Sequence, residues 1–413
     1  MIKKIANKLV GMLGFFSLYC RSLAWKRDDG IILVGSWFGE KFADNSRYLY
    51  QYLFENRKQL GLKRVVWVTR KETVCKELLE MGYECYMMDS KESIYYHKHA
   101  GWHIVCNAIM DFQNFKGDII GKYSYGAKRV NLWHGVGFKA VSQSSNEYNL
   151  MKKQHKVLFA LKELISDLGL ELFLNGPWVN YFILCTSEIN KFAMKRNFGL
   201  DDSKHIISNY PRNCKSIKLL ENEEKVIGTM KKYKNKVMYL PTFRTGDDNF
   251  NFTSFKDVLN ECLVNNNILF IQKAHSADTN NKVEIGLNGN VLNLSSDFDI
   301  NVLLPYITVL ITDYSSVMSD AMYHNKPVLY LVPDYEEYKN GDRGFVINPD
   351  EIMKGPIFKS IDELNDKLAY YCQNPEEAKF TGYAIAREKL WGNSNKELDE
   401  IWQDIVTYIN KYN

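Results

Sequence analysis

Short runs of consecutive apolar residues recur along the whole chain, and stretches with helical periodicity separate many of them. A run that is apolar at every position is typical of a parallel strand buried on both faces, whereas a strand with one solvated face alternates. We therefore predict strands at nine runs: Ile31–Val34, Val65–Val68, Ile104–Cys106, Val130–Trp133, Phe182–Cys185, Val237–Leu240, Ile268–Ile271, Val309–Ile311 and Val328–Leu331.

Helix signals lie between these runs. Ser360 and Glu363 have the spacing of a capping box, which predicts that a helix begins there. The residues that follow place one apolar face on that helix: Ile361, Leu364, Leu368 and Tyr371. Alternation of strands and helices over the whole chain predicts an α/β fold with parallel sheets.

The polar segment Lys215–Lys236 separates five predicted strands from four. A chain of 413 residues is long for a single core, so we place a domain boundary in this segment. The predicted domains are residues 1–214 and 215–390, followed by a C-terminal helix at 391–413. Two Rossmann-like, doubly wound domains that face each other enclose a cleft at the carboxyl ends of their strands.

Composition changes this picture little. With 46% hydrophobic and 25% charged residues the chain is typical of a globular protein, and a net charge of +4 does not favour a nucleic-acid partner. The eight cysteines are scattered without a CxxC pair, which indicates reduced thiols.

Two segments combine basic and apolar residues. Lys3, Lys4 and Lys8 precede the apolar stretch Leu9–Cys20, which is too short to span a bilayer. The segment Met151–Trp178 also begins with basic residues and continues with an apolar helical pattern. The N-terminal stretch is either an amphipathic helix on the inner membrane face or a packed helix. The second segment either contacts the membrane or a lipid-linked acceptor or is an ordinary inserted helix.

The clearest local motif is Ile311-Thr312-Asp313-Tyr314-Ser315-Ser316, in which a buried strand ends in hydroxyl residues and a helix begins. Ser315 or Ser316 is expected to cap this helix and to contact a phosphate. Asp320, one turn later, is a candidate acceptor for ribose hydroxyls. The alternative is an ordinary helix cap with a surface aspartate.

A second motif, Asn131–Gly137, also follows a predicted strand. Gly135 lets the backbone approach a ligand closely. His134 is a candidate general base, because an imidazole titrates near neutrality. A single histidine is more often structural, so this motif depends on the others.

Cationic and hydroxyl side chains follow other predicted strands or lie near the domain boundary. Lysine, histidine and arginine in such positions suit an anionic substrate, and arginine binds phosphate oxygens in a bidentate manner. The candidates are Lys273, His275, Thr242, Arg244, Arg212 and Arg343. Asp313 is expected to orient a cationic neighbour or to cap the helix.

Several site classes lack support. The sequence has no G-x-G-x-x-G after a strand, no G-x-x-x-x-G-K-[ST] and no H-E-x-x-H. His97, His99 and His103 have no evident fourth metal ligand and are predicted to lie on a solvated helix. Asp297 and Asp299 form a D-x-D, a pattern too common to indicate a metal site.

In their order along the chain these motifs resemble the CDP-glycerol glycerophosphotransferase family of teichoic-acid and capsule synthesis. The resemblance extends over roughly residues 30–390 and rests on Gly35-Ser36-Trp37-Phe38-Gly39, Asp44-Asn45, Trp133-His134-Gly135, Tyr210-Pro211-Arg212-Asn213, Pro241-Thr242-Phe243-Arg244, Lys273-Ala274-His275, Thr312-Asp313-Tyr314-Ser315-Ser316, Asp320, Lys326-Pro327, Asp334, Tyr338 and Arg343-Gly344-Phe345.

The resemblance implies a GT-B-like fold that holds a CDP-glycerol or CDP-ribitol donor mainly in its second domain, with no metal and no cofactor. It also implies a lipid-linked glycan or polymer acceptor and peripheral attachment to the cytoplasmic face of the membrane. An acceptor hydroxyl would attack the donor phosphorus and CMP would leave, with His134 as the base. Another set would hold the diphosphate: His275, Arg244, Arg212, Arg343, Ser315 and Ser316. Two alternatives remain open, a GT-B glycosyltransferase that uses a nucleotide sugar and a non-catalytic scaffold protein.

Overall fold

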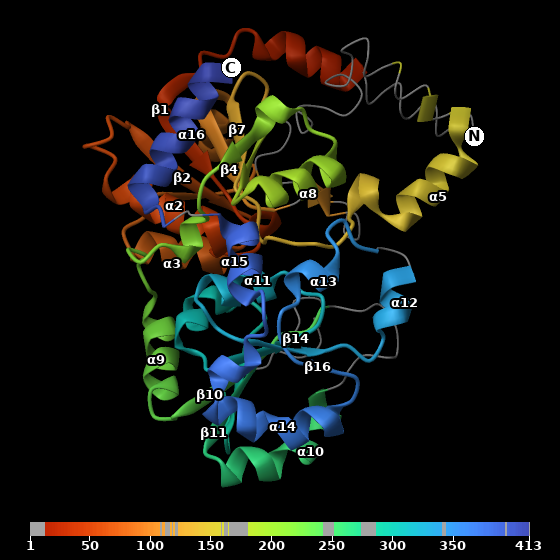
Figure 1. Cartoon of the computed structure of the whole chain (residues 1–413). Coiled ribbons are helices and arrows are strands. Elements are labelled where there is room, and N and C mark those ends of the chain that lie inside the picture. Colours follow the sequence, from red (N-terminus) through yellow and green to blue (C-terminus); the bar gives the residue numbers. More distant parts are fainter. Residues whose placement is uncertain are drawn as a thin grey trace.

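The computed structural model describes residues 13–107, 110–111, 116–117, 119, 123–157, 159–160, 164, 181–242, 252–273, 286–340, 344–392 and 395–412. Two seven-stranded sheets form the centres of two domains, drawn one above the other in Figure 1. A separate two-stranded antiparallel sheet pairs β5 (Met110–Asp111) with β6 (Lys116–Gly117).

All strands of the first sheet are parallel, in the order β3-β2-β1-β4-β7-β8-β9. They are β1 (Asp28–Val34), β2 (Arg64–Thr69), β3 (Cys85–Met87), β4 (Ala100–Val105), β7 (Lys128–Asn131), β8 (Phe182–Cys185) and β9 (His205–Ile207). The order reverses between β1 and β4, which is the switch point of a doubly wound sheet, where a crevice for ligands forms.

The second sheet repeats this order as β12-β13-β11-β10-β14-β15-β16 and places its switch point between β10 and β14. Its strands are β10 (Asn235–Tyr239), β11 (Ile268–Lys273), β12 (Gly286–Asn288), β13 (Val291–Leu294), β14 (Val309–Thr312), β15 (Val328–Leu331) and β16 (Ile357–Phe358). Only the edge strand β12 pairs antiparallel among these described strands. The two doubly wound sheets predicted from the apolar runs are thus both present.

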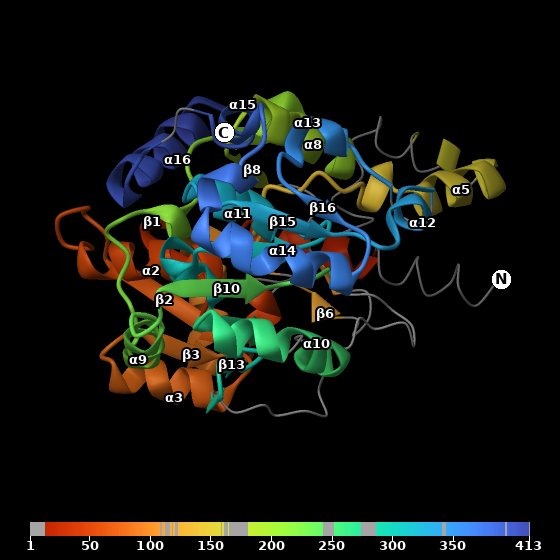
Figure 2. The same ribbon diagram turned by 60° about the horizontal axis from the view of Figure 1, so that its bottom comes forward.

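Helices connect the strands and cover the sheets (Figures 1 and 2). In and around the first sheet they are residues 13–22, α2 (Asp44–Glu55), α3 (Glu72–Glu80), α4 (Lys91–His99), α5 (Asn146–Gln154) and α8 (Glu188–Phe198). Those of the remaining chain are α9 (Glu221–Met230), α10 (Phe252–Asn265), α11 (Val317–Tyr323), α12 (Tyr335–Asn340), α13 (Pro349–Ile352), α14 (Ile361–Gln373), α15 (Tyr383–Trp391) and α16 (Leu398–Tyr412). Short 3₁₀ turns complete them: η1 (Trp37–Gly39), η3 (Ser142–Ser144), η5 (Asp202–Lys204), η6 (Pro211–Asn213), η7 (Ile300–Tyr306) and η8 (Pro375–Ala378).

The helix predicted after Ser360 is α14. The Ser360 hydroxyl accepts a hydrogen bond from the Glu363 amide at 3.2 Å, as the capping pattern predicted. The Glu363 carboxylate accepts from the Lys359 amide instead of closing the box on Ser360. Leu364 and Leu368 are buried against the second sheet, which confirms the predicted apolar face.

The C-terminal helix α16 packs on the first domain, although it follows the second in sequence (Figures 1 and 2). The rings of Trp402 and Trp102 lie 5.1 Å apart, and the Ser208 hydroxyl donates to Asp404 at 2.5 Å. The chain therefore crosses between the domains twice, before α9 and before α16. The boundaries at 214 and 390 remain predictions.

The prediction of a solvated helix holds for His99, which ends α4 and is not buried, but it was wrong for His97 and His103. His97 lies in α4 but is buried, where its Nδ1 bonds to the Ser93 carbonyl at 2.6 Å. His103 lies in the buried strand β4, not on a helix. Burial lowers the pKa of His103 well below its usual value, since the charged ring would be desolvated. The sequence did not place His103 in a strand because it is a polar residue beside the apolar run.

Candidate functional site

A cavity of about 180 Å³ lies between the two domains. Its first-domain wall consists of Trp37, Lys41, Ala43, Asp44, His134 and Arg212. The second domain contributes Lys273, Asp297, Phe298, Asp299, Ile300, Asn301, Ser315, Ser316, Val317 and Asp320. Six predicted site residues thus come together here: His134, Arg212, Lys273, Ser315, Ser316 and Asp320. Because they follow the carboxyl ends of parallel strands, the edge expected to bind ligands is the edge that forms the cavity.

His134 follows β7 through a tight turn. The Asn131 side chain accepts from the Trp133 amide at 2.9 Å, and Trp133 takes a left-handed backbone conformation with φ 53°. His134 Nδ1 lies 3.0 Å from the Cys106 carbonyl oxygen. A carbonyl only accepts, so Nδ1 carries the proton and Nε2 keeps its lone pair. This is the tautomer that a general base needs.

The surroundings of His134 keep the ring neutral at pH 7. Burial lowers the pKa of His134, because the charged imidazolium would lose its hydration. The carboxylate of Asp44 acts in the opposite direction and favours the charged form. Two indole rings enclose the imidazole, with ring-centre distances of 5.1 Å to Trp37 and 4.3 Å to Trp133. A neutral ring is ready to take a proton.

Asp313 organises the switch point of the second sheet. Its Oδ1 accepts from the Thr242 amide at 2.8 Å and from the Thr242 hydroxyl at 2.7 Å. The same oxygen accepts from the Ser315 amide at 3.2 Å. Asp313 therefore joins the ends of β10 and β14, and it fixes the turn that carries Ser315.

The predicted capping by a serine hydroxyl was wrong. Ser316 is the N-cap of α11, but its side chain forms no capping hydrogen bond. Its backbone is already in the right-handed helical region, with φ −61° and ψ −15°, which points the hydroxyl away from the helix amides. Ser315 and Ser316 both line the cavity.

Arg212 and Asp320 are partners of each other. Arg212 Nη2 donates to both oxygens of Asp320, at 2.7 and 2.8 Å, while Nη1 donates to Asp44 at 2.6 Å and to the His134 carbonyl at 2.9 Å. All three side chains of this ion triad, Asp44–Arg212–Asp320, are buried. Burial alone would lower the pKa of Arg212, but the two carboxylates outweigh it and raise the pKa. The triad links the two domains beside the cavity.

Gly135 lies against the second domain. A Cβ atom at this position would be 2.5 Å from Ser316 Oγ and 3.0 Å from Ser316 Cβ. A glycine here therefore allows the loop after β7 to meet the start of α11. Further along the same loop, backbone hydrogen bonds join Ala140 to Gly344 and Val346 to Phe138. The His134 segment is in this way part of the domain interface.

We expect Gly135→Ala to destabilise the closed arrangement by about 1–3 kcal/mol, because the added methyl overlaps Ser316. Urea unfolding measures this loss. Gly137→Ala is the matched control, since a Cβ there lies 3.8 Å from Ser316 Cβ, an ordinary contact. Ser316→Gly in the Gly135→Ala background should restore stability. Equal stability of the two alanine variants would contradict the close approach.

Three predicted site residues, His275, Arg244 and Arg343, lie outside the described residues. Their roles remain predictions. The other predicted residues that do not line the cavity are close to it. Gly135 contacts Ser316, and Thr242 is held by Asp313 and accepts from the Lys139 ammonium at 3.4 Å.

Comparison with known proteins identifies the family. The sequence profile of the CDP-Glycerol:Poly(glycerophosphate) glycerophosphotransferase family matches residues 17–396. The chain belongs to this family. The family predicted from the motifs is thereby confirmed, together with its enzyme class, a glycerophosphate transferase that uses CDP-glycerol.

Curated relatives agree with this membership. The chain is 26% identical to the teichoic acid poly(glycerol phosphate) polymerase of Bacillus spizizenii, over 91% of this chain and 92% of the relative. It is 25% identical to the polymerase of the same name from Bacillus subtilis, over 89% of this chain but only 47% of that longer protein.

Solved structures confirm the fold. The wall teichoic acid polymerase TagF superposes with a TM-score of 0.69 and 16% identity, over 98% of both chains. A putative UDP-N-acetylglucosamine 2-epimerase from Listeria monocytogenes superposes with a TM-score of 0.51 and 12% identity, over 92% of this chain and 97% of the other. The predicted GT-B-like architecture, two Rossmann-like domains about a cleft, is confirmed.

Two charged residues of the cavity in this chain were not predicted from the sequence. Lys41 follows the Gly35–Gly39 motif and donates to the Ser296 carbonyl of the second domain at 2.8 Å. Burial and the nearby Lys273 lower the pKa of Lys41 to about 8. Lys41 and Lys273 thus bring two cations from opposite domains to one cavity. The only available signal was the position of Lys41 just after a motif.

The second missed group is Asp299, half of the dismissed D-x-D. Its Oδ2 accepts from the Asp44 amide and from the Tyr48 hydroxyl, both at 2.9 Å, so it joins the second domain to the start of α2. The described residues contain no group of three or more histidine, cysteine or acidic side chains arranged to hold a metal ion.

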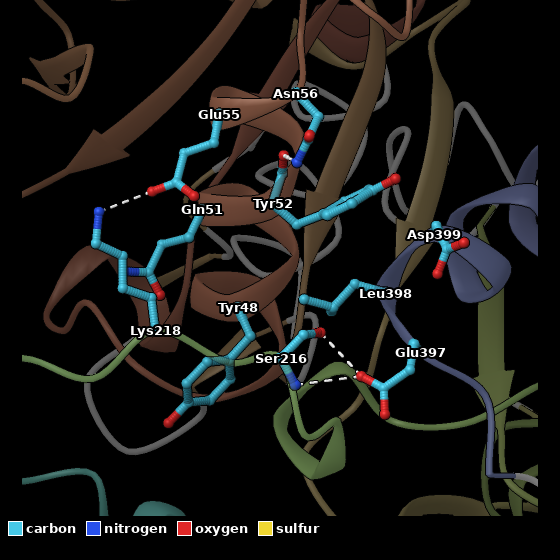
Figure 3. Close-up of a pocket in the computed structure, with 10 residues that line it drawn as sticks. All are labelled: Tyr48, Gln51, Tyr52, Glu55, Asn56, Ser216, Lys218, Glu397, Leu398 and Asp399. Carbon is cyan, nitrogen blue, oxygen red and sulfur yellow. Dashed lines mark hydrogen bonds and ion pairs between the residues drawn. The ribbon is translucent and has the colours of Figure 1, made fainter.

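Another hollow, of about 360 Å³, lies between α2, the segment before α9 and the start of α16 (Figure 3). Glu55 pairs there with Lys218, and Glu397 accepts from the backbone and hydroxyl of Ser216. None of the predicted site residues lines this hollow. It lies where the chain crosses between the domains, so the cavity that contains His134 is the candidate site.

Proposed function

We propose that this chain transfers glycerol phosphate from CDP-glycerol to a hydroxyl of a lipid-linked teichoic-acid or capsule polymer and releases CMP. One observation carries the proposal: His134, with Nε2 available as a base, lines a single cavity together with two serines and a lysine of the other domain. A base on one wall and phosphate ligands on the other suit attack by a hydroxyl on phosphorus.

The second domain offers the donor site. Ser315 and Ser316 bring hydroxyls to the cavity and Lys273 brings an ammonium group. Thr242, fixed by Asp313, lies at the switch point beside them. These groups would hold the diphosphate of CDP-glycerol, and Lys41 would approach it from the first domain. Preorganised donors and cations of this kind stabilise the charge that develops on phosphate oxygens.

In the reaction, the acceptor hydroxyl loses its proton to His134 Nε2 while its oxygen forms a bond to the phosphorus that carries glycerol. The bond between that phosphorus and the bridging oxygen breaks, and the electron pair leaves with CMP. Because a nucleoside monophosphate leaves readily, the base and the charge stabilisation carry most of the catalysis.

Incubation of the protein with CDP-glycerol, CDP-ribitol or UDP-sugars, each with a short lipid-linked acceptor, tests the function. We expect CMP release with CDP-glycerol and a product mass that increases by glycerol phosphate units. Release of nucleotide from a UDP-sugar, with a sugar added to the acceptor, would favour a glycosyltransferase. Binding of CDP without turnover of any donor would favour a scaffold protein.

We expect the affinity for CDP-glycerol to fall above pH 8, because Lys41 loses its proton near that pH and then no longer attracts the diphosphate. Lys41→Met should raise KM for CDP-glycerol about tenfold at pH 7 and abolish this pH dependence. Initial rates between pH 7 and 9 measure both effects. Lys76→Met, at a lysine with 79% of its side chain exposed, is the control. An unchanged KM in Lys41→Met would exclude a role in donor binding.

Attachment to the inner membrane face is part of the proposal. Leu13, Phe16 and Leu23 are exposed in and just after the helix at 13–22, and Leu150 is exposed on α5 beside Lys152. Exposed apolar groups next to basic ones suit a surface of anionic lipid. In the described part of the chain, no helix has the length and apolar character to cross a bilayer. Flotation with vesicles of anionic lipid tests the attachment, and recovery of all protein in the unbound fraction would refute it.

A further inference from the structure

Asp44 occupies an unusual position at the cavity. It begins α2 with a left-handed backbone, φ 64°, and only 4% of it is exposed. Its Oδ1 accepts from the Asn45 amide at 2.8 Å and from Arg212 Nη1 at 2.6 Å. No hydrogen bond joins Oδ2 to any of the described residues. One carboxylate oxygen is therefore anchored, and the other remains available in a residue that lines the cavity.

The same contacts that anchor Asp44 also hold the His134 segment. Arg212 Nη1 donates both to Asp44 and to the His134 carbonyl, at 2.6 and 2.9 Å. The Asn45 side chain donates to the Trp133 carbonyl at 2.8 Å. The start of α2 and the turn of His134 are thus joined by one guanidinium and one amide.

Backbone strain marks the same two places. Asp44 and Trp133 are both non-glycine residues with φ between 50° and 65°. Such conformations cost of the order of 1 kcal/mol or more and persist where the surrounding contacts over-determine them. Among the eight described non-glycine residues with positive φ, Asp44 and Trp133 are two that Arg212 and Asn45 hold in place by hydrogen bonds.

We propose that Asp44 is the counter-ion of His134: its carboxylate, anchored by Arg212, stabilises the imidazolium that forms when His134 takes the proton of the acceptor hydroxyl. Asp44 is thereby a positioning residue that acts through His134. The inference rests on the proposed function, in which His134 is the base.

Other charged groups also lie near His134, and a titration of His134 must distinguish their effects from that of Asp44. Near the ring or in the cavity are Asp44 on α2, Arg212 on η6, Lys139 on the loop after β7, Lys273 on β11, Asp320 on α11, Lys41 after η1, and Asp297 and Asp299 before η7. Arg212 and Lys139 lower the pKa of His134, whereas Asp44 raises it. Removal of the Asp44 charge should therefore lower the pKa of His134, since the imidazolium loses its main stabilising neighbour.

The test measures the pKa of His134 by NMR in the ligand-free protein and the pH profile of kcat/KM with CDP-glycerol. In Asp44→Asn we expect the pKa of His134 and the acidic limb of the profile to shift downward together, by about one pH unit. We also expect kcat at pH 7 to fall about 10- to 100-fold, although more His134 is deprotonated. A lower kcat together with a larger fraction of deprotonated His134 is the result expected when the counter-ion is lost.

Asp320→Asn is the matched control, because it removes a carboxylate from the same arginine at Nη2, the nitrogen that does not bond to the His134 carbonyl. It should leave the pKa of His134 in place even where it slows turnover. Asp44→Glu keeps the charge, so it should keep the pKa while kcat falls. Asp44→Glu also keeps the proposal testable if Asp44→Asn does not fold. A fall of a full unit in the pKa of His134 in Asp44→Glu would overturn the proposal.

An unchanged pKa and acidic limb in Asp44→Asn would overturn the proposal and leave Asp44 as a structural partner of Arg212. Failure of the proposed function has a different result. In that case His134→Ala retains turnover, while the NMR pKa still reports whether Asp44 and His134 interact.

Discussion

His134→Ala should lower the rate of CMP release by about 10²–10⁴-fold, the usual contribution of a general base. The imidazole lines the cavity with Nε2 unprotonated, and Nδ1 is held by the Cys106 carbonyl. Alanine removes the proton acceptor but leaves Ser315, Ser316 and Lys273 in the second domain in place. CDP binding, measured by calorimetry, should therefore change little.

His99→Ala is the control for replacing a histidine. His99 ends α4 just before β4 begins, so it lies at the amino-terminal edge of the first sheet, opposite the cavity. The turnover of His99→Ala should equal that of the unmodified protein. If His134→Ala also kept near-normal turnover, the assignment of the base would be wrong. If it lost CDP binding as well, the imidazole would act mainly in holding the donor.

Continuous apolar runs predicted the central strands well, because a strand buried on both faces has no polar side. Phe182–Cys185 and Val328–Leu331 match β8 and β15 at both ends. The strands that sequence reasoning missed are short or lie near the sheet edges. β3, for example, has three residues and is only partly buried, so its sequence carries a weak signal.

The site was predictable as far as it follows the ends of strands. His134, Ser315 and Lys273 lie at such ends, and parallel sheets gather their carboxyl ends on one edge. The contacts that could not be predicted from the sequence are those that depend on how the two domains pack together. The pairing of Arg212 with Asp320 joins residues 108 positions apart, and no local pattern records it.

The ion triad Asp44–Arg212–Asp320 provides the second large expected effect. Arg212→Met should lower the free energy of unfolding by about 3–5 kcal/mol, as does removal of one partner from a buried ion pair. Methionine fills much of the volume but leaves two buried carboxylates without their cation. Urea titration at pH 7 measures the loss. Arg64→Met is the matched control, because Arg64 pairs with Glu84 at the surface with 58% of its side chain exposed. Its loss should stay below about 1 kcal/mol.

The decrease in the free energy of unfolding caused by Arg212→Met should also depend on pH. Without the guanidinium, burial and the nearby charge of Asp44 raise the pKa of Asp320 further above that of the unfolded chain. A raised pKa means that the folded state binds more protons, so the stability of the variant increases as pH falls. The difference from the unmodified protein should therefore narrow toward pH 4. Asp44→Asn and Asp320→Asn, added to Arg212→Met, should recover much of the loss at pH 7, because a neutral set needs no cation. A loss that neither acid nor these substitutions reduce would mean that Arg212 stabilises the interface by packing, not by charge.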